Sequence, residues 1–371
     1  MNENILSGIL IFGAIQAIFF AFLFLTKKNK EIPDKIIVYW LFVLTINIIS
    51  IAFSKAVNNN YLKVLQISFT LLHGPFLYLY TRKLTIEKTK YNNTDYLHFF
   101  PFVFIVLLSL VIASFSLDTK ILIKLIAIAG IMSGLTYCVL VFINLIEHKK
   151  RIKDKFSFSE TINLQWLFRL TVGLFIIWIG GSISGILLRF FNFNIPILWM
   201  FTVIPVFIFY IGFYGIKQNI IYSSNIIHIV KQENVLTKAN RQNSDRYKKS
   251  GLQKQSMKLI NERLLNVMQT EQLFLNSTLS LLELSEHLKI PSHHITQTLN
   301  EYTNQSFYDF VNLYRVEEFK KKVFAPENSS FSLLGIAFDC GFNSKSSFNR
   351  IFKKYTNQAP SEYKNTFRQK F

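Results

Sequence analysis

The chain has 371 residues, of which 50% are hydrophobic and 16% aromatic, and its formal net charge at pH 7 is +19. Charged residues make up 17% of the chain, against about a quarter of an ordinary soluble domain, so the composition argues against an all-soluble protein. The two cysteines, Cys138 and Cys340, cannot form a disulfide framework, and no Cys or His spacing in the sequence is typical of zinc. No metal and no cofactor is expected.

Long apolar runs occupy the first 215 residues. A helix needs about 20 apolar residues to cross a bilayer, and seven runs approach this length. They are residues 5–25, 36–53, 64–80, 96–115, 121–146, 167–188 and 195–214. The third is the most interrupted, by Gln66, His73, Gly74 and Pro75. The runs predict a seven-helix transmembrane domain over residues 1–216, with the lipid bilayer as its partner.

Basic residues predict the orientation of this domain. Thirteen Lys and Arg residues lie in the three loops after the first, third and fifth runs, and five lie on the alternate side. Loops rich in Lys and Arg stay in the cytoplasm. We therefore expect the N-terminus outside and everything after residue 214 in the cytoplasm.

Ionisable side chains are scarce within the apolar runs. His73 and His98 are the candidates for an ion path, but packing is the favoured interpretation of both. A transporter or channel with a cytoplasmic regulatory or docking domain is the alternative function, and this scarcity disfavours it. The sequence shows no Ser/His/Asp set, phosphoacceptor motif or ATP-binding loop, so the chain is not expected to be an enzyme.

Residues 217–254 are rich in Asn, Gln, Ser and Lys and predict a juxtamembrane linker. An apolar cluster at residues 226–230 within this linker is suited to pairing two chains. A second copy of the chain is therefore one candidate partner.

Residues 255–371 have the helical periodicity of an independent domain. The stripe of Met257, Ile260, Leu264, Leu265 and Met268 predicts a first helix. Leucines 281, 282, 284 and 288 predict a short second helix, and Pro291 opens a third, exposed helix over about residues 292–302. Asn304 tolerates the left-handed conformation that ends a helix, and a long helix follows over residues 306–323. The pattern predicts a helix-turn-helix and a connecting helix.

The same unit is repeated afterwards. A short helix around residues 333–337 precedes a turn at Cys340, Gly341 and Phe342, and Ser344 is placed to cap a second exposed helix ending at Asn357. Each exposed helix has the size to enter a major groove, and two on one rigid chain would reach grooves about 34 Å apart.

A family resemblance rests on this second unit. The pattern comprises Ile336, Ala337, Cys340, Gly341, Phe342, Ser344, Ser346, Phe348, Arg350, Phe352, Lys353 and Lys354, closed by Pro360, Ser361 and Tyr363. It resembles the signature of the AraC/XylS transcription regulators over about residues 257–363. The sequence departs from that signature at Pro291, where a serine is usual, and at Asn304 and Asn357, where glycines are usual.

The complete layout is similar to membrane-anchored regulators of Bacteroidetes-type bacteria. The resemblance implies an all-α protein of the bacterial cytoplasmic membrane, with a double helix-turn-helix DNA-binding domain over residues 255–371. It implies a one-component transcription regulator whose partners are double-stranded promoter DNA and an unknown signal ligand or membrane partner. Cys340 resembles the small buried cysteine of the family's turn.

The resemblance also assigns roles by position. Base contacts fall to His293, Thr296 and Gln297 in the first unit and to Lys345, Ser346 and Asn349 in the second. Gln and Asn can bridge adenine and Lys can reach guanine. Phosphate contacts fall to Lys320, Lys321, Lys322, Arg350, Lys353 and Lys354. The alternative for every one of these residues is a solvated helix face, and adjacent His293 and His294 point apart on a helix, which disfavours a metal site.

Overall fold

The computed structural model describes residues 3–28, 30–57, 60–85, 92–114, 119–158, 164–192, 202–218 and 254–368. Within these ranges every regular element is a helix, which confirms the predicted all-α class, and one isolated antiparallel bridge joins Phe156 to Ser280. The chain divides into two compact units, Met1–His148 with Leu164–Ile220, and Lys149–Asn163 with Ile221–Phe371. Most of the predicted linker, including residues 226–230, lies outside the described ranges.

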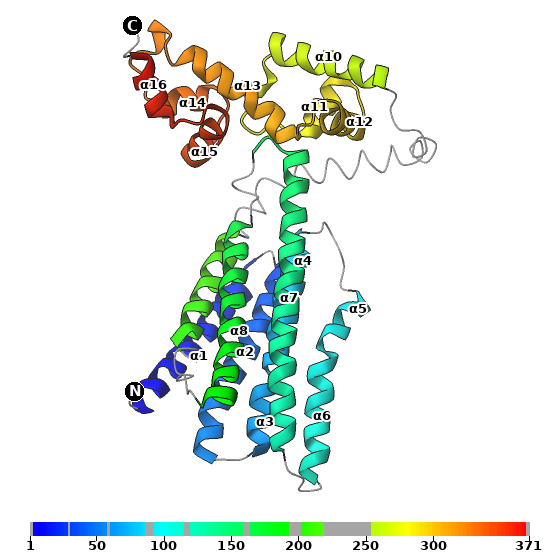
Figure 1. Cartoon of the computed structure of the whole chain (residues 1–371), viewed down its shortest axis with the longest axis vertical. Helices are drawn as coiled ribbons and strands as arrows, with labels where there is room; N and C mark the ends of the chain where they lie inside the picture. The colour runs from blue at the N-terminus through cyan, green and yellow to red at the C-terminus, as the bar shows by residue number, and fades with distance from the viewer. Residues whose placement is uncertain are drawn as a thin grey trace. The chain divides into compact units, whose positions relative to one another are not determined.

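The first unit is a bundle of apolar helices (Figure 1). Its elements are α1 (Glu3–Thr26), α2 (Ile32–Val57), α3 (Asn60–Ser68), α4 (Thr70–Thr85), α5 (Asn93–Tyr96), the 3₁₀ turn Leu97–Phe99, α6 (Phe100–Ser114), α7 (Lys120–Lys155), α8 (Gln165–Phe191) and a further helix, Thr202–Gln218. Trp40, Tyr80 and Phe24 are among its largest fully buried side chains. The core of this unit is therefore aromatic as well as aliphatic.

Six helical segments in the described ranges are long and apolar enough to cross a membrane. They match the first six predicted runs. The helix Thr202–Gln218 lies where the seventh was predicted but is shorter, and residues 195–201, which open that run, lie outside the described residues. Seven spans stay a prediction.

The outward surface of these helices is apolar. In the membrane-length segments that contain α6 and α8, only 11% of the most apolar stretch of 18 residues is buried. The exposed side chains include Leu107 at 58% and Ile176 at 62% exposure. Water-soluble proteins rarely expose such extended apolar surface. These faces are of the kind that lipid covers.

The third run is divided into two helices, and the division lies at Phe69 between α3 and α4. Of the four residues that interrupt this run in the sequence, Gln66 lies in α3, and His73, Gly74 and Pro75 lie inside α4. Proline lacks an N–H, and its ring clashes with the carbonyl one turn earlier, here that of Leu71. The break at Phe69 lies two residues before Leu71. The His73 ring beside it accepts a hydrogen bond from Trp40 Nε1 at 3.2 Å, and its Nε2 lies 3.3 Å from Asn47 Nδ2.

Helix α7 corrects a second expectation. The sequence placed Lys149, Lys150, Arg151, Lys153 and Lys155 in a loop, but all five lie on the last turns of α7. Lys and Arg are good helix formers, and basic side chains suit a helix C-terminus, so nothing in this stretch ends the helix before Phe156. These last turns, from Lys149 onward, belong to the second unit.

The second unit contains the remaining helices. They are α10 (Lys254–Thr270), the 3₁₀ turn Leu273–Leu275, α11 (Leu281–Leu288), α12 (Ser292–Gln297), the π-helical turn Thr298–Tyr302, α13 (Phe307–Lys322), the 3₁₀ turn Pro326–Asn328, α14 (Leu333–Asp339), α15 (Lys345–Thr356) and α16 (Pro360–Arg368). Figure 1 shows α13 running between α10–α12 and α14–α16. The order matches two helix-turn-helix units joined by one long helix.

Helix α13 contributes to two separate cores. Phe307, Phe310 and Val311 pack with α10, α11 and α12, whereas Phe319 and Val316 pack with α14 and α15. One stiff helix thus carries both units, and a change in its packing reaches each of them.

The predicted stripe of α10 is correct except at one position. Met257, Leu264 and Met268 are buried, but Leu265 is exposed and Val267 is buried instead. Leu265 follows Leu264 by one residue, about 100° around the helix, so it leaves the face that the other side chains share.

Candidate nucleic-acid interface

The first helix-turn-helix unit is bounded by local hydrogen bonds. Ser280 Oγ accepts from the Glu283 backbone N–H at 3.2 Å, and Glu283 Oε2 accepts from the Ser280 N–H at 2.7 Å, forming a capping box at the start of α11. Lys289 ends α11 with φ of 56°. Pro291 stands one residue before α12, at the N-cap. The exposed helix is therefore α12 followed by a wider π-helical turn, rather than the single α-helix that was predicted.

Two of the three base-contact candidates on α12 have partners on their own helix. Thr296 Oγ1 donates to the Ser292 carbonyl at 3.0 Å, and Gln297 Nε2 donates to Glu301 at 3.1 Å. His293 is exposed, while Thr296 and Gln297 are half-buried. The spacing of three and four residues places all three on neighbouring positions of one face.

The base-contact candidates of the second helix-turn-helix unit are more exposed. Ser344 Oγ accepts from the Ser347 N–H at 3.1 Å and caps α15, as predicted. Lys345, Ser346 and Asn349 are exposed on this helix, and Phe348 is buried on its opposite side. α15 is thus a two-sided helix whose polar face is available to a partner.

The turns that frame the exposed helices also match the sequence. Asn304 and Asn357 adopt φ of 53° and 60°, the left-handed conformation expected of them. Cys340 is fully buried, and burial raises the pKa of its thiol to about 12, so it is a protonated core side chain at neutral pH.

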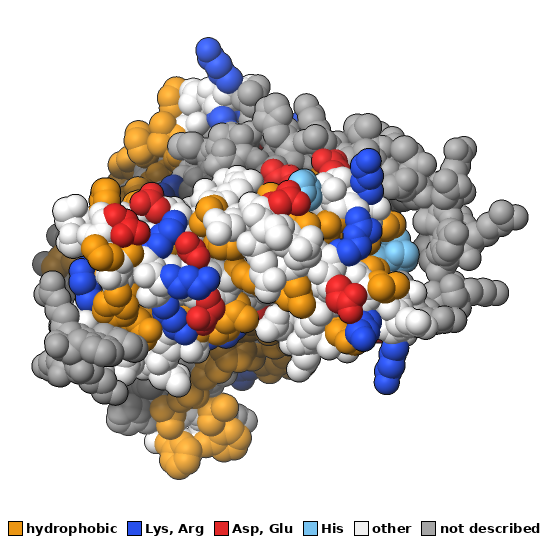
Figure 2. All heavy atoms as spheres, turned by 90° about the horizontal axis from the view of Figure 1, so that it is seen from above, with side chains coloured by type: hydrophobic (Ala, Val, Ile, Leu, Met, Phe, Trp, Pro, Cys, Tyr) orange, Lys and Arg blue, Asp and Glu red, His pale blue; other side chains and the backbone are white. Residues whose placement is uncertain are grey.

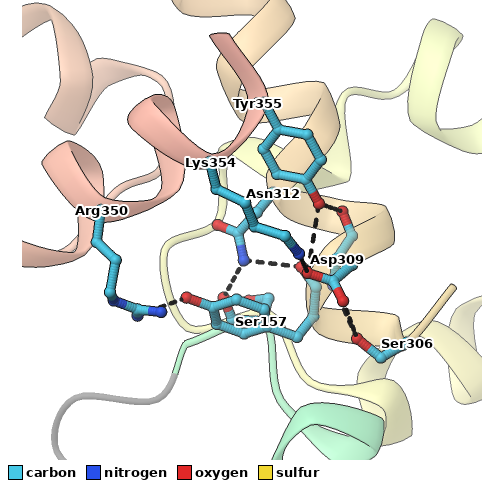
Figure 3. Close-up of polar contacts among 8 residues, drawn as sticks. Ser157, Ser306, Asp309, Asn312, Arg350, Lys354 and Tyr355 are labelled. Carbon is cyan, nitrogen blue, oxygen red and sulfur yellow. Dashed lines mark hydrogen bonds and ion pairs between the residues drawn. The ribbon is translucent and has the colours of Figure 1, made fainter. Parts of the chain in front are cut away.

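Two predicted phosphate contacts of α15 are instead engaged with α13 (Figure 3). Arg350 donates to the Tyr308 hydroxyl at 2.9 Å, and Lys354 forms an ion pair with Asp309, whose carboxylate also accepts from Tyr355. Burial alone would raise the pKa of Asp309, but hydrogen bonds from Lys354 and Ser306 lower that pKa below its ordinary value. These contacts fix α15 on α13. Lys353, between them in sequence, is exposed.

The lysines at the end of α13 lie beside acidic residues. Lys320 pairs with Glu317 at 2.7 Å, and Lys321 and Lys322 lie 3.9 and 3.7 Å from Glu318. Figure 2 shows Lys and Arg side chains interspersed with Asp and Glu on the face that it presents. Such mixing is typical of a solvated surface and differs from the basic stripe of a nucleic-acid site. The three lysines are thus less suited to phosphate than Lys353.

One group of polar residues was not predicted to have a role. Arg315 and Asn312 are both buried at the centre of α13, and both donate to the backbone of Ser157. The sequence placed Asn312 and Arg315 only within the long connecting helix over residues 306–323. Nothing local marks Ser157, since its partners lie more than 120 residues away.

Comparison with known proteins identifies the C-terminal part. A helix-turn-helix domain family, of the AraC type, matches residues 284–366. Uncharacterized HTH-type transcriptional regulators of Staphylococcus aureus strains COL and MSSA476 are each 32% identical over 93 residues. That match covers 25% of this chain and 12% of each relative, so the chain spans about an eighth of the length of the curated relatives it matches. No solved structure matches the chain.

The chain therefore carries an AraC-type helix-turn-helix domain at its C-terminal end, homologous to that of HTH-type transcriptional regulators. The residues around Cys340 and Phe348, on which the resemblance rests, lie within this domain.

Proposed function

We propose that the chain is a membrane-embedded one-component transcription regulator that binds promoter DNA through two helix-turn-helix units. The observation that carries the proposal is the two-sided character of α15. Lys345, Ser346 and Asn349 are exposed on a capped helix whose other side is buried against α13. Lysine, serine and asparagine in such positions can read base edges in a major groove.

The membrane part of the proposal rests on the six apolar helices and their exposed apolar faces. The three basic segments favour an N-terminus outside and a C-terminal domain in the cytoplasm, where DNA is reached. The membrane domain would sense an unknown signal ligand, lipid state or membrane partner. On this proposal the two helix-turn-helix units respond to the signal by binding promoter DNA.

Base contacts are proposed for Lys345, Ser346 and Asn349, with His293, Thr296 and Gln297 as the weaker set because two of these have partners within their own helix. Phosphate contact is proposed first for Lys353. Arg350 and Lys354 would have to leave Tyr308 and Asp309 to reach phosphate.

Genome-wide mapping of bound DNA tests this function. Wild type is compared with Asn349→Ala, Lys353→Ala and, as a matched control, Ser330→Ala, which alters an exposed serine outside the exposed helices. Asn349→Ala should change which sites are preferred, by about 1–3 kcal/mol of base discrimination. Lys353→Ala should weaken all sites alike and reduce the slope of log affinity against log salt by about 0.9.

An unchanged site profile in both variants would reject α15 as a recognition helix. If wild type enriches no DNA at all, the transcription proposal fails, and flux into vesicles then tests the transporter alternative.

A further inference from the structure

Arg315 is buried in the second compact unit, and all five of its N–H groups donate hydrogen bonds. Nε donates to the Phe274 carbonyl at 2.8 Å. Nη1 donates to the Ser157 carbonyl at 3.1 Å and to Asn312 Oδ1 at 3.2 Å. Nη2 donates to Ser157 Oγ at 3.1 Å and to the Asn276 carbonyl at 2.7 Å. A guanidinium has five such donors, so two of the five depend on Ser157.

This guanidinium is charged and 2% exposed. Burial lowers the pKa of Arg315 to about 10, which still leaves the group protonated at neutral pH. A buried charge is tolerated only when its hydrogen bonds are made. The site at the centre of α13 is therefore complete only when Ser157 occupies it.

Ser157 also binds Leu279, the residue before the N-cap of α11. Its N–H and its Oγ both donate to the Leu279 carbonyl, at 3.2 and 2.7 Å. Its own carbonyl accepts from Asn312 Nδ2 at 2.9 Å, a contact drawn in Figure 3. A single serine thus links α11 of the first helix-turn-helix unit to α13, which carries the second.

The residues around Ser157 extend this contact. Phe156 forms the antiparallel bridge with Ser280, and both Phe156 and Phe158 are buried. Lys153 Nζ lies 5.9 Å from the centre of the Tyr308 ring, and Arg350 lies 6.0 Å from the same centre while bonding its hydroxyl. We call residues 152–158 the docking segment. It contacts α11, α13 and the tyrosine that holds α15.

We propose that the docking segment, supplied by the end of α7, is a structural part of the DNA-binding unit. Docking of this segment fixes the two helix-turn-helix units in the arrangement that binds DNA. The inference rests on the proposed function. α7 is one continuous helix whose residues up to His148 belong to the first unit. A shift of α7 withdraws Ser157, leaves Arg315 with two unmade hydrogen bonds and breaks the bonds from Ser157 to the Leu279 carbonyl, and DNA affinity falls.

The test uses the full-length protein in lipid nanodiscs. Ser157→Ala removes the Oγ that Arg315 and Leu279 share, and Ser330→Ala is the matched control. Amide hydrogen exchange in α11 and α13 reports docking without DNA. Fluorescence anisotropy on a duplex carrying the most enriched site from the genome-wide mapping reports function. We expect about tenfold faster exchange and about tenfold weaker binding in Ser157→Ala, the effect of one hydrogen bond to a charged group, and neither change in the control.

A reversible cross-link separates loss of docking from general damage. Residues opposite each other in an antiparallel bridge have Cα atoms about 4.5–5.5 Å apart, within reach of a disulfide. Phe156→Cys with Ser280→Cys, added to Ser157→Ala, should restore DNA affinity when oxidised and lose it on reduction.

Exchange and affinity of Ser157→Ala within about twofold of wild type would overturn the inference. Oxidised cross-linked protein that binds DNA no better than the reduced form would overturn it as well. If exchange rises but wild type binds no DNA, the docking contact stands while its role in DNA binding and the proposed function both fail.

Discussion

Gly341 occupies a position in the second helix-turn-helix that no other residue fits. Its φ is +86°, and a Cβ added there would lie 2.4 Å from the Phe274 carbonyl oxygen, 2.9 Å from the Leu275 oxygen and 3.0 Å from Arg315 Nε. The first two atoms are backbone and belong to the first helix-turn-helix unit. The turn of one unit therefore packs directly on the backbone of the other.

The cost of Gly341→Ala has two parts. A side chain at positive φ costs about 1–2 kcal/mol. The Phe274 oxygen must also move, and it accepts the 2.8 Å hydrogen bond from Arg315 Nε, so that bond to a charged group, typically about 1.5–3 kcal/mol, is weakened or lost. We expect the free energy of unfolding of the second compact unit to fall by about 2.5–5 kcal/mol.

Urea titration in detergent, followed by proteolysis of the C-terminal unit, measures this loss. Gly335→Ala is the matched control, because a Cβ at Gly335 meets only Ser332 Oγ, at 3.3 Å, and φ there is ordinary. It should change the unfolding free energy by no more than about 1 kcal/mol, since alanine is favoured over glycine in a helix. A Gly341→Ala loss as small as that of the control would refute the steric reasoning.

Three further predictions concern α15. Ser344→Ala removes the N-cap and should lower the unfolding free energy by about 1 kcal/mol in the same urea titration. Asn357→Gly should be neutral or slightly stabilising, whereas Asn357→Ala should lose about 1–2 kcal/mol because φ there is 60°. The pKa of Asp309 is depressed, so its contribution is present at neutral pH and is lost as pH falls through its folded pKa, below the ordinary value of 3.8. Near-ultraviolet circular dichroism of Tyr355 should be constant from about pH 5 to 8 and change only in stronger acid, and Asp309→Asn should reproduce the acid spectrum at neutral pH.

The second helix-turn-helix was accessible from sequence because each of its signals is local. Each signal depends only on neighbouring residues of the same helix. These signals are the cap at Ser344, the buried stripe of Phe348 and Phe352, and the left-handed residue Asn357. Periodicity and capping report short-range geometry. The same holds for the long apolar helices, whose composition alone predicts them.

The site around Arg315 was not accessible in this way. Ser157 and Arg315 are 158 positions apart, and no periodic pattern relates them. The basic residues before Ser157 were already explained by the orientation of the membrane domain. The sequence therefore gave no separate indication that α7 continues through them. Arg350 and Lys354 show the same limit, because their contacts with Tyr308 and Asp309 depend on how α15 packs on α13.

The separation of the docking segment from its site has a consequence for biosynthesis. The ribosome makes Ser157 155 residues before Asn312, an interval of about 8–31 s at about 5–20 residues per second. Throughout that time Ser157 has neither Asn312 nor Arg315 to bind. Docking therefore waits until α13 has been made, and chains truncated before α13 would keep Phe156 and Phe158 without their site.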